Sequence, residues 1–143
     1  SGTPCIADPG ALIVAKAHEL NIKVNPLVGP SSIILSLMAS GFNGQNFCFH
    51  GYVPIEENKK INFLKEIQKN IKVKQETQIF IETPYRNNKL LIDILKIDNK
   101  SLKLCVATNL TDTNQTIVSK TLNQWSKNKI PDLSRKLCVF LLN

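Results

Sequence analysis

The pattern of hydrophobic and polar positions divides the chain into short segments of alternating helical and extended character. Apolar residues recur at helical spacing in four segments, which we expect to form helices: 11–20, 32–39, 56–71 and 87–95. Short apolar or alternating runs predict strands at 22–27, 47–52, 78–81, 102–107, 116–120 and 137–142. A helical turn is expected around Trp125, before the last of these strands.

This alternation of helices and strands is typical of proteins in which helices cover a mostly parallel or mixed sheet. It predicts one α/β domain built as a three-layer sandwich, with a mixed sheet of about five strands covered by helices. The run at 137–142 is apolar throughout, so we expect it to be a central strand. The short connections near the end of the chain predict at least one antiparallel pair.

Three of the helices carry more detailed expectations. The sequence Asp8-Pro9-Gly10 predicts a helix start, with Asp8 as the capping residue and Pro9 at the first helical position. The helix at 32–39 is apolar nearly all round, so it is predicted to be buried on most sides and to end at Gly41. The helix at 56–71 is amphipathic, and its buried stripe is predicted to be Ile61, Leu64, Ile67 and Ile71.

Composition and charge narrow the class of protein. The chain has 143 residues, of which 43% are hydrophobic and 20% charged, as is typical of a single soluble domain. Its net charge of +7 weakly favours a polyanionic partner such as RNA, although Lys, Asn and Ile are abundant throughout the chain. No apolar run has the length of a membrane span, and the first twenty residues lack the pattern of a signal peptide. We therefore expect a cytoplasmic protein without membrane contact.

The cysteines and histidines give no indication of a metal site. The four cysteines are far apart and none has a histidine at ligand spacing, so we expect free thiols, three of them buried in strand-like runs: Cys48, Cys105 and Cys138. His18 is expected at the surface. His50 is a candidate pocket residue, although a hydrogen-bonded strand histidine is the favoured interpretation.

Three loops are candidates for chemistry, because open α/β sheets bind ligands where strands end and helices begin. They are GTPCIADPG at 2–10, LVGPSS at 27–32 and ETPYR at 82–86. Each also has a structural explanation. Asp8 can simply cap a helix, Gly-Pro-Ser is a common helix start, and Glu82 and Arg86 have the spacing of a surface ion pair.

In combination, these motifs resemble one family. The order GTPCIADPG, PLVGPSS, FCFHGYVP, IFIETPYR and NLT is similar to that of the tetrapyrrole methylase superfamily of S-adenosylmethionine-dependent methyltransferases. Within it, the motifs look most like the ribosomal RNA small-subunit branch, which methylates a cytidine ribose at its 2′-oxygen. The resemblance runs over the whole chain and implies S-adenosylmethionine as cofactor.

The resemblance also implies roles for individual residues. Glu82 is carried over as the candidate catalytic group. The positions that match cofactor-binding segments are Gly2, Thr3, Pro4, Asp8, Gly29, Pro30, Ser31, Ser32 and Thr83. The positions that match substrate-contacting segments are Tyr52, Arg86, Asn109 and Thr111. The chain departs from the family at 108–112, where Thr-Asn-Leu-Thr-Asp stands in place of an Arg-Glu-Leu-Thr-Lys pattern, so its contacts with a substrate are expected to differ.

The same resemblance implies a domain organisation and partners. Residues 1–143 match the C-terminal domain of a two-domain methyltransferase, with the donor bound in a cleft shared with an N-terminal domain that this chain lacks. Ribosomal RNA or the small ribosomal subunit is the implied partner, and a homodimer is the implied assembly. We expect no methyl transfer by this chain alone. Two other interpretations stay open: a methyltransferase for a corrin or porphyrin precursor, and a non-catalytic dimerisation domain.

Overall fold

A five-stranded mixed sheet forms the centre of the computed structural model, which describes residues 3–143. The strands lie in the order β1 (Phe47–Tyr52), β2 (Thr77–Ile81), β5 (Cys138–Leu142), β3 (Lys103–Thr108) and β4 (Thr116–Thr121). Strands β1 and β2 are parallel, and the other three pairs are antiparallel. As predicted, β5 is central, and all of its residues are buried.

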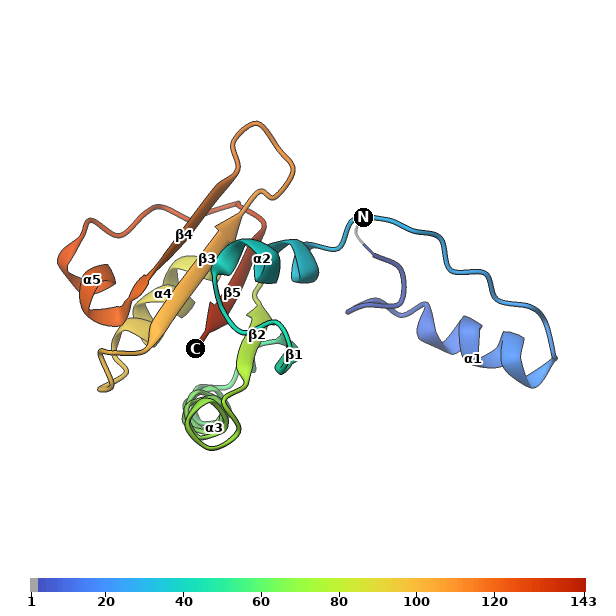
Figure 1. Cartoon of the computed structure of the whole chain (residues 1–143), viewed down its shortest axis with the longest axis horizontal. Coiled ribbons are helices and arrows are strands. Elements are labelled where there is room, and N and C mark those ends of the chain that lie inside the picture. Colours follow the sequence, from blue (N-terminus) through green and yellow to red (C-terminus); the bar gives the residue numbers. More distant parts are fainter. Residues whose placement is uncertain (1–2) are drawn as a thin grey trace.

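Helices cover both faces of this sheet, which confirms the predicted α/β sandwich (Figure 1). One face is covered by α3 (Glu57–Lys74), α4 (Asn87–Leu95) and α5 (Leu122–Lys127), which form the larger core with the sheet. The other face is covered by α2 (Ser32–Ser40), which forms the smaller core. Helix α5 is fixed by the Thr121–Gln124 capping box at its start. No helix within residues 3–143 combines the length and apolarity that crossing a membrane requires.

Helix α2 is buried on one side only, so the prediction that it is buried on most sides is wrong. Ile33 and Leu37 pack against the sheet, whereas Met38 is 75% exposed and Ile34 is also exposed. The reason is that α2 lies alone on its face of the sheet, with no second helix beside it in the described residues. As predicted, the helix ends at Gly41, whose φ of +76° is in the left-handed region.

Helix α3 corrects one position of its predicted buried stripe. Leu64, Ile67 and Ile71 are buried as expected, but Ile61 is 41% exposed and the buried residue of the first turn is Lys60. Positions 60, 64, 67 and 71 follow the helical period, so the stripe itself is correct and a lysine occupies its first place. The burial of Lys60 is explained by Asp93 on α4, whose Oδ2 lies 2.5 Å from Lys60 Nζ.

The first part of the chain differs most from expectation. The strand predicted at 22–27 is not formed, and every residue from 21 to 30 is exposed. A strand needs a neighbour to satisfy its backbone N–H and C=O groups, and none of the five strands pairs with this segment. Helix α1 (Ala11–Glu19) has no buried residue and lies apart from the sheet (Figure 1).

The start of α1 also corrects the predicted cap. The helix begins at Ala11 with Gly10 as its N-cap residue, so Asp8 is not the N-cap. Instead, Asp8 Oδ1 accepts hydrogen bonds from the backbone N–H groups of Gly10 and Cys5, at 2.9 and 3.2 Å. These two N–H groups lower the pKa of the Asp8 carboxyl below its usual value. Asp8 thus closes the loop that leads into the helix.

Candidate functional site

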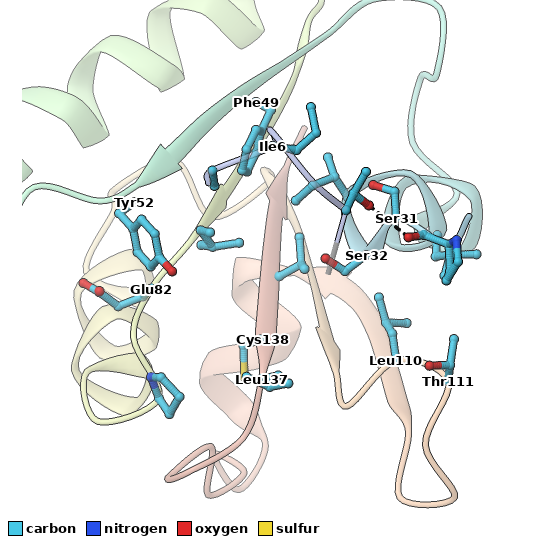
Figure 2. A pocket seen from close by; sticks show the side chains of 18 residues that line it. Ile6, Ser31, Ser32, Phe49, Tyr52, Glu82, Leu110, Thr111, Leu137 and Cys138 are labelled. Atoms are coloured by element: carbon cyan, nitrogen blue, oxygen red, sulfur yellow. Dashed lines mark hydrogen bonds between the residues drawn. The ribbon is translucent and has the colours of Figure 1, made fainter. Parts of the chain in front are cut away.

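A cavity of ≈ 480 Å³ lies at the edge of the sheet where β1, β2 and β3 end and β5 begins. The sequence predicts ligand binding at this edge, because its three candidate loops lie at strand ends or helix starts. The cavity is bounded by four parts of the chain: the loop at 3–7, the start of α2, the ends of β1 and β2, and the loops that flank β3 and β5. Figure 2 shows the side chains from these parts gathered around one space.

The structure brings together many, but not all, of the residues that the sequence singles out. Those that line the cavity are Thr3, Pro30, Ser31, Ser32, Tyr52, Glu82 and Thr111. Those that the structure places outside the lining are Pro4, Asp8, Gly29, Thr83, Arg86 and Asn109. Gly2 lies outside the described residues. Ser31 and Ser32 lie opposite Tyr52 and Glu82 in the view of Figure 2, so the lining is polar on two sides.

The loop at 3–7 is held over the cavity by a hydrogen bond to the turn before α2. The Thr3 hydroxyl donates to the Pro30 carbonyl oxygen, with 2.9 Å between Oγ1 and O. This bond joins the first and second of the loops that the sequence marked as candidates. It is a contact between residues 27 positions apart, and Ile6 and Ala7, which follow Thr3 in the loop, line the cavity.

Glu82 is a buried carboxylate at the end of β2, with its side chain 4% exposed. Its Oε1 accepts the backbone N–H of Thr83 and a guanidinium N–H of Arg86, each at 2.6 Å. The ion pair with Arg86 that its spacing suggested is therefore present, but its acidic end is inside the protein. Within residues 3–143, both donors converge on Oε1 and none lies at hydrogen-bond distance from Oε2. Oε2 thus keeps its capacity to accept a hydrogen bond.

Tyr52 reaches the cavity because of an irregularity in β1. Phe49 pairs with Ile79 and Tyr52 with Ile81, so three steps along β1 match two steps along β2. The extra residue forms a β-bulge, and Gly51 within it has a φ of +69°. Residues other than glycine rarely adopt this φ, and a bulge beside a site commonly changes the direction of the next side chain.

We expect Gly51→Ala to lower the free energy of unfolding by about 1–2 kcal/mol, the cost of a left-handed φ for a residue with a Cβ. A Cβ at this position would meet no atom within 4 Å, so the cost comes from the backbone alone. Urea unfolding would measure it, with Gly44→Ala as control, because a Cβ there meets only Leu37 Cδ2 at 4.0 Å and Gly44 has no positive φ. Equal effects of the two substitutions would contradict this account of the bulge.

Asn109 has a structural contact that its predicted role in substrate binding did not include. Its backbone N–H donates to the Leu137 carbonyl at 2.9 Å, and its side-chain Oδ1 accepts the Leu137 N–H at 3.1 Å. This pair of bonds joins the loop after β3 to the residue before β5. Leu110 and Thr111, which follow Asn109, line the cavity.

The loop before β5 is also fixed from the other side, by α4. Asn88 Oδ1 accepts the Leu133 N–H at 2.7 Å, and its Nδ2 donates to Asp132 Oδ1 at 2.9 Å. Hydrogen bonds from Asn88 and then from Ser134 lower the pKa of Asp132 to about 2, so this carboxylate is ionised at neutral pH. Asn87 Nδ2 donates to the Lys136 carbonyl at 2.8 Å. These bonds position Leu137 and Cys138 at the cavity.

Several lining residues were missed by the sequence analysis, and most of them are apolar: Ile6, Ala7, Ile33, Leu35, Phe49, Ile81, Pro84, Leu110, Leu137, Cys138 and Val139. Ile6, Ala7, Pro84 and Leu110 lie inside or beside the motifs, so proximity to a motif could have indicated them. The residues of β5 had no such signal, because their place depends on the antiparallel direction of that strand. Burial raises the pKa of the Cys138 thiol to about 12, so it is protonated at neutral pH.

His50 is a hydrogen-bonded strand residue, as the favoured interpretation held. Its Nε2 lies 2.7 Å from Gln78 Oε1, and its ring packs edge-on against Phe63. It does not line the cavity. His18 is exposed. All four cysteines are free, and no group of three or more His, Cys, Asp or Glu side chains in the described part of the chain is arranged to hold a metal ion.

Comparison with known proteins connects this geometry to a family. Curated proteins named ribosomal RNA small subunit methyltransferase I are similar in sequence, although no protein-family model matches the chain. The protein from Buchnera aphidicola subsp. Schizaphis graminum is 36% identical over 111 residues, which cover 78% of this chain and 38% of the relative. The protein from Vibrio cholerae serotype O1 is 36% identical over 117 residues, which cover 82% of this chain and 39% of the relative. The chain thus spans about two fifths of the length of these relatives.

Solved structures share the fold at low sequence identity. Diphthine synthase matches with a TM-score of 0.67 and 15% identity, over 99% of this chain and 56% of its own. Cobalt precorrin-4 methyltransferase matches with a TM-score of 0.64 and 14% identity, over 99% of this chain and 61% of its own. Uroporphyrin-III C-methyl transferase from Thermus thermophilus, solved with S-adenosyl homocysteine, matches with a TM-score of 0.57 and 14% identity, over 99% of this chain and 62% of its own.

The fold is that of an α/β domain of the kind found in these methyltransferase structures. The sequence matches narrow this class further. In sequence the chain is similar to the ribosomal RNA small subunit methyltransferase I relatives, and in fold it is similar to the cobalt precorrin-4 and uroporphyrin-III methyltransferases. The resemblance inferred from the order of the motifs is therefore confirmed.

Proposed function

We propose that this chain is part of an S-adenosylmethionine-dependent methyltransferase that methylates ribosomal RNA at the ribose 2′-oxygen of a cytidine. One observation carries the proposal: motif residues from separate segments of the chain converge on a single cavity at the sheet edge. The names of the relatives support RNA as the acceptor, and the net charge of +7 agrees with a polyanionic partner.

The cavity is chemically suited to S-adenosylmethionine. Its volume of ≈ 480 Å³ falls in the range of about 300–1,000 Å³ that is usual for small-molecule sites. Apolar side chains such as Ile6 and Phe49 would pack against the adenine ring. The hydroxyls of Ser31 and Ser32 would hydrogen-bond the polar groups of the donor.

We further propose that the complete protein has a second, N-terminal domain that covers residues 11–30. Leu12, Ile13 and Leu27 are 79%, 76% and 91% exposed, although large contiguous apolar surfaces are rare on monomeric soluble proteins. The backbone of 22–27 also lacks a strand partner, which a neighbouring sheet would supply. Such a domain would close the cavity from the side of the loop at 3–7.

The assembly proposed for the complete protein is a cytoplasmic homodimer that acts on the small ribosomal subunit. The exposed Ile34 and Met38 on α2 offer an apolar face for contact between two copies. Ile34 and Met38 are not among the residues that line the cavity, so a dimer contact through them would leave the lining residues Tyr52 and Glu82 uncovered.

The chain's own residues would contribute positioning and one proton acceptor. When bound, S-adenosylmethionine supplies an electrophilic methyl group. Tyr52 and Thr111 would orient the acceptor nucleotide at the mouth of the cavity, and the apolar lining would exclude water. Glu82 Oε2 would accept the proton of the ribose hydroxyl, while Arg86 and the Thr83 N–H hold Oε1 in place.

The test uses the full-length protein, a tritiated methyl donor and small ribosomal subunits that lack the modification. We expect label in the RNA and one new phosphodiester linkage that resists alkaline hydrolysis, because a 2′-O-methyl group removes the hydroxyl that attacks this linkage. The 143-residue chain alone is expected to transfer no methyl group, because the proposed N-terminal domain would supply part of the donor site. Label in a corrin or porphyrin precursor, with none in RNA, would contradict the proposal, and transfer by the 143-residue chain alone would contradict its two-domain form.

A further inference from the structure

Tyr85 is the most exposed aromatic side chain in the described part of the molecule. It is 87% exposed, compared with 56% for Tyr52, and these two are the only tyrosines of the chain. Both lie at the edge of the sheet that carries the cavity, because β1 and β2 are parallel and end there. Tyr85 contributes little to the packed core, so folding alone does not explain an aromatic residue at this position.

The backbone around Tyr85 is fixed although its side chain is free. The Arg86 N–H donates to the Thr83 carbonyl at 2.9 Å, which closes a turn with Pro84 and Tyr85 at its two central positions. The Glu82–Arg86 ion pair spans the same turn. The turn is joined to β2 on one side and to α4 on the other, so the backbone of Tyr85 is held in place by two regular elements.

The surroundings of Tyr85 combine the cavity with positive charge. Pro84, its neighbour in the turn, lines the cavity. The hydrogen bond from Asn87 to the Lys136 carbonyl brings the loop before β5 against the start of α4. Arg135 and Lys136 in that loop have no carboxylate within 4.0 Å among the described residues, so both charges are available to a ligand.

We propose that Tyr85 is a stacking platform for a base of the RNA substrate, next to the nucleotide that enters the cavity. The inference rests on the proposed function and names a residue that determines how its substrate is held. A rigidly supported, solvent-exposed aromatic ring loses little entropy on binding, and stacking on a base does not require a particular base sequence. Arg135 and Lys136, in the loop that Asn87 holds against the start of α4, would meet the phosphates that accompany the base.

The experiment measures binding of a fluorescently labelled twelve-nucleotide oligocytidylate to the full-length protein with S-adenosyl homocysteine present. We expect Tyr85→Ala to weaken RNA binding about tenfold, within the 1–3 kcal/mol that one base stacked on an aromatic ring contributes. Tyr85→Phe is expected to bind as the wild type, because the ring is retained. Val73→Ala, which truncates a 70% exposed residue on α3, is the control and should change nothing.

Two further measurements separate stacking from a structural role. The slope of affinity against salt concentration should be the same for Tyr85→Ala and the wild type, because no phosphate contact is lost. Calorimetric affinity for S-adenosylmethionine should also be unchanged. Equal RNA affinity of Tyr85→Ala and the wild type would overturn this inference alone. Failure of the wild type to bind RNA while it binds the donor would overturn the RNA assignment itself.

Discussion

Replacing Lys60 with methionine is expected to lower the free energy of unfolding by about 3 kcal/mol or more, because it leaves a buried carboxylate without its main partner. Lys60 and Asp93 are each less than one-tenth exposed, and Lys60 Nζ lies 2.5 Å from Asp93 Oδ2. Burial lowers the pKa of Lys60, but its contacts with the carboxylates of Asp93 and Glu57 outweigh this effect and raise the pKa. Burial likewise raises the pKa of Asp93, but Lys60 and Lys96 together bring it below the usual value. Both groups are thus charged inside the protein.

Two further variants make this prediction specific. Lys59→Met removes an ion pair with Glu56 that has a similar distance, 2.8 Å, but is exposed, so we expect a change below about 0.5 kcal/mol. The double variant Lys60→Met with Asp93→Leu is expected to recover most of the loss, since no charge is then left buried. Urea unfolding followed by the fluorescence of Trp125, the only tryptophan of the chain, would measure all three. A loss of less than 1 kcal/mol for Lys60→Met would refute the account.

The depressed pKa of Asp93 gives the same prediction a pH dependence. A carboxyl whose pKa is lower in the folded protein stabilises it above the unfolded value, here about 3.8, and this contribution is lost as the pH falls through the folded pKa. The difference in stability between the wild type and Lys60→Met should therefore shrink as the pH is lowered below about 4. A difference that stays constant down to pH 2 would show that lost packing, not charge, causes the effect.

Lys60 also illustrates what the sequence could predict about the fold. The periodicity of 56–71 correctly predicted a helix with one buried stripe, because apolar spacing reports which face is covered. It could not predict that a lysine joins that stripe. Lys60 is buried because it pairs with Asp93, which lies 33 positions away on another helix. The strand expected at 22–27 failed for a related reason. Its residues have the pattern of a strand, but a strand forms only beside a partner, and the described chain supplies none.

In the candidate site, too, the residues with a local sequence pattern were predictable and those placed by distant parts of the chain were not. Motifs such as GTPCIADPG and ETPYR indicated the polar residues Thr3 and Glu82, because loops at strand ends carry hydrogen-bonding groups. The apolar half of the lining was not predictable in this way. Val139 and Cys138 read as ordinary core residues of a central strand, and only the antiparallel direction of β5 brings its first residues to the cavity. Pairing direction depends on the whole sheet and has no local signal.

Glu82→Gln is expected to lower the kcat of RNA methylation by about a hundredfold or more, within the 10²–10⁴ typical of a lost proton acceptor. Glutamine has the same shape, and its side-chain oxygen can still accept the hydrogen bonds of Thr83 and Arg86 that Oε1 accepts now. What it lacks is a carboxylate oxygen that can take up a proton at the position of Oε2. The affinity for S-adenosylmethionine, measured by calorimetry, is therefore expected to change little.

The split between kcat and donor affinity separates a proton acceptor from a group that only holds the donor. Glu76→Gln is the matched control: Glu76 immediately precedes β2, at the opposite end of the strand from Glu82, and its carboxylate accepts a hydrogen bond from Gln78. It should leave kcat unchanged. A Glu82→Gln protein with near-normal kcat but much weaker donor binding would mean that this carboxylate holds the donor and takes no proton from the acceptor.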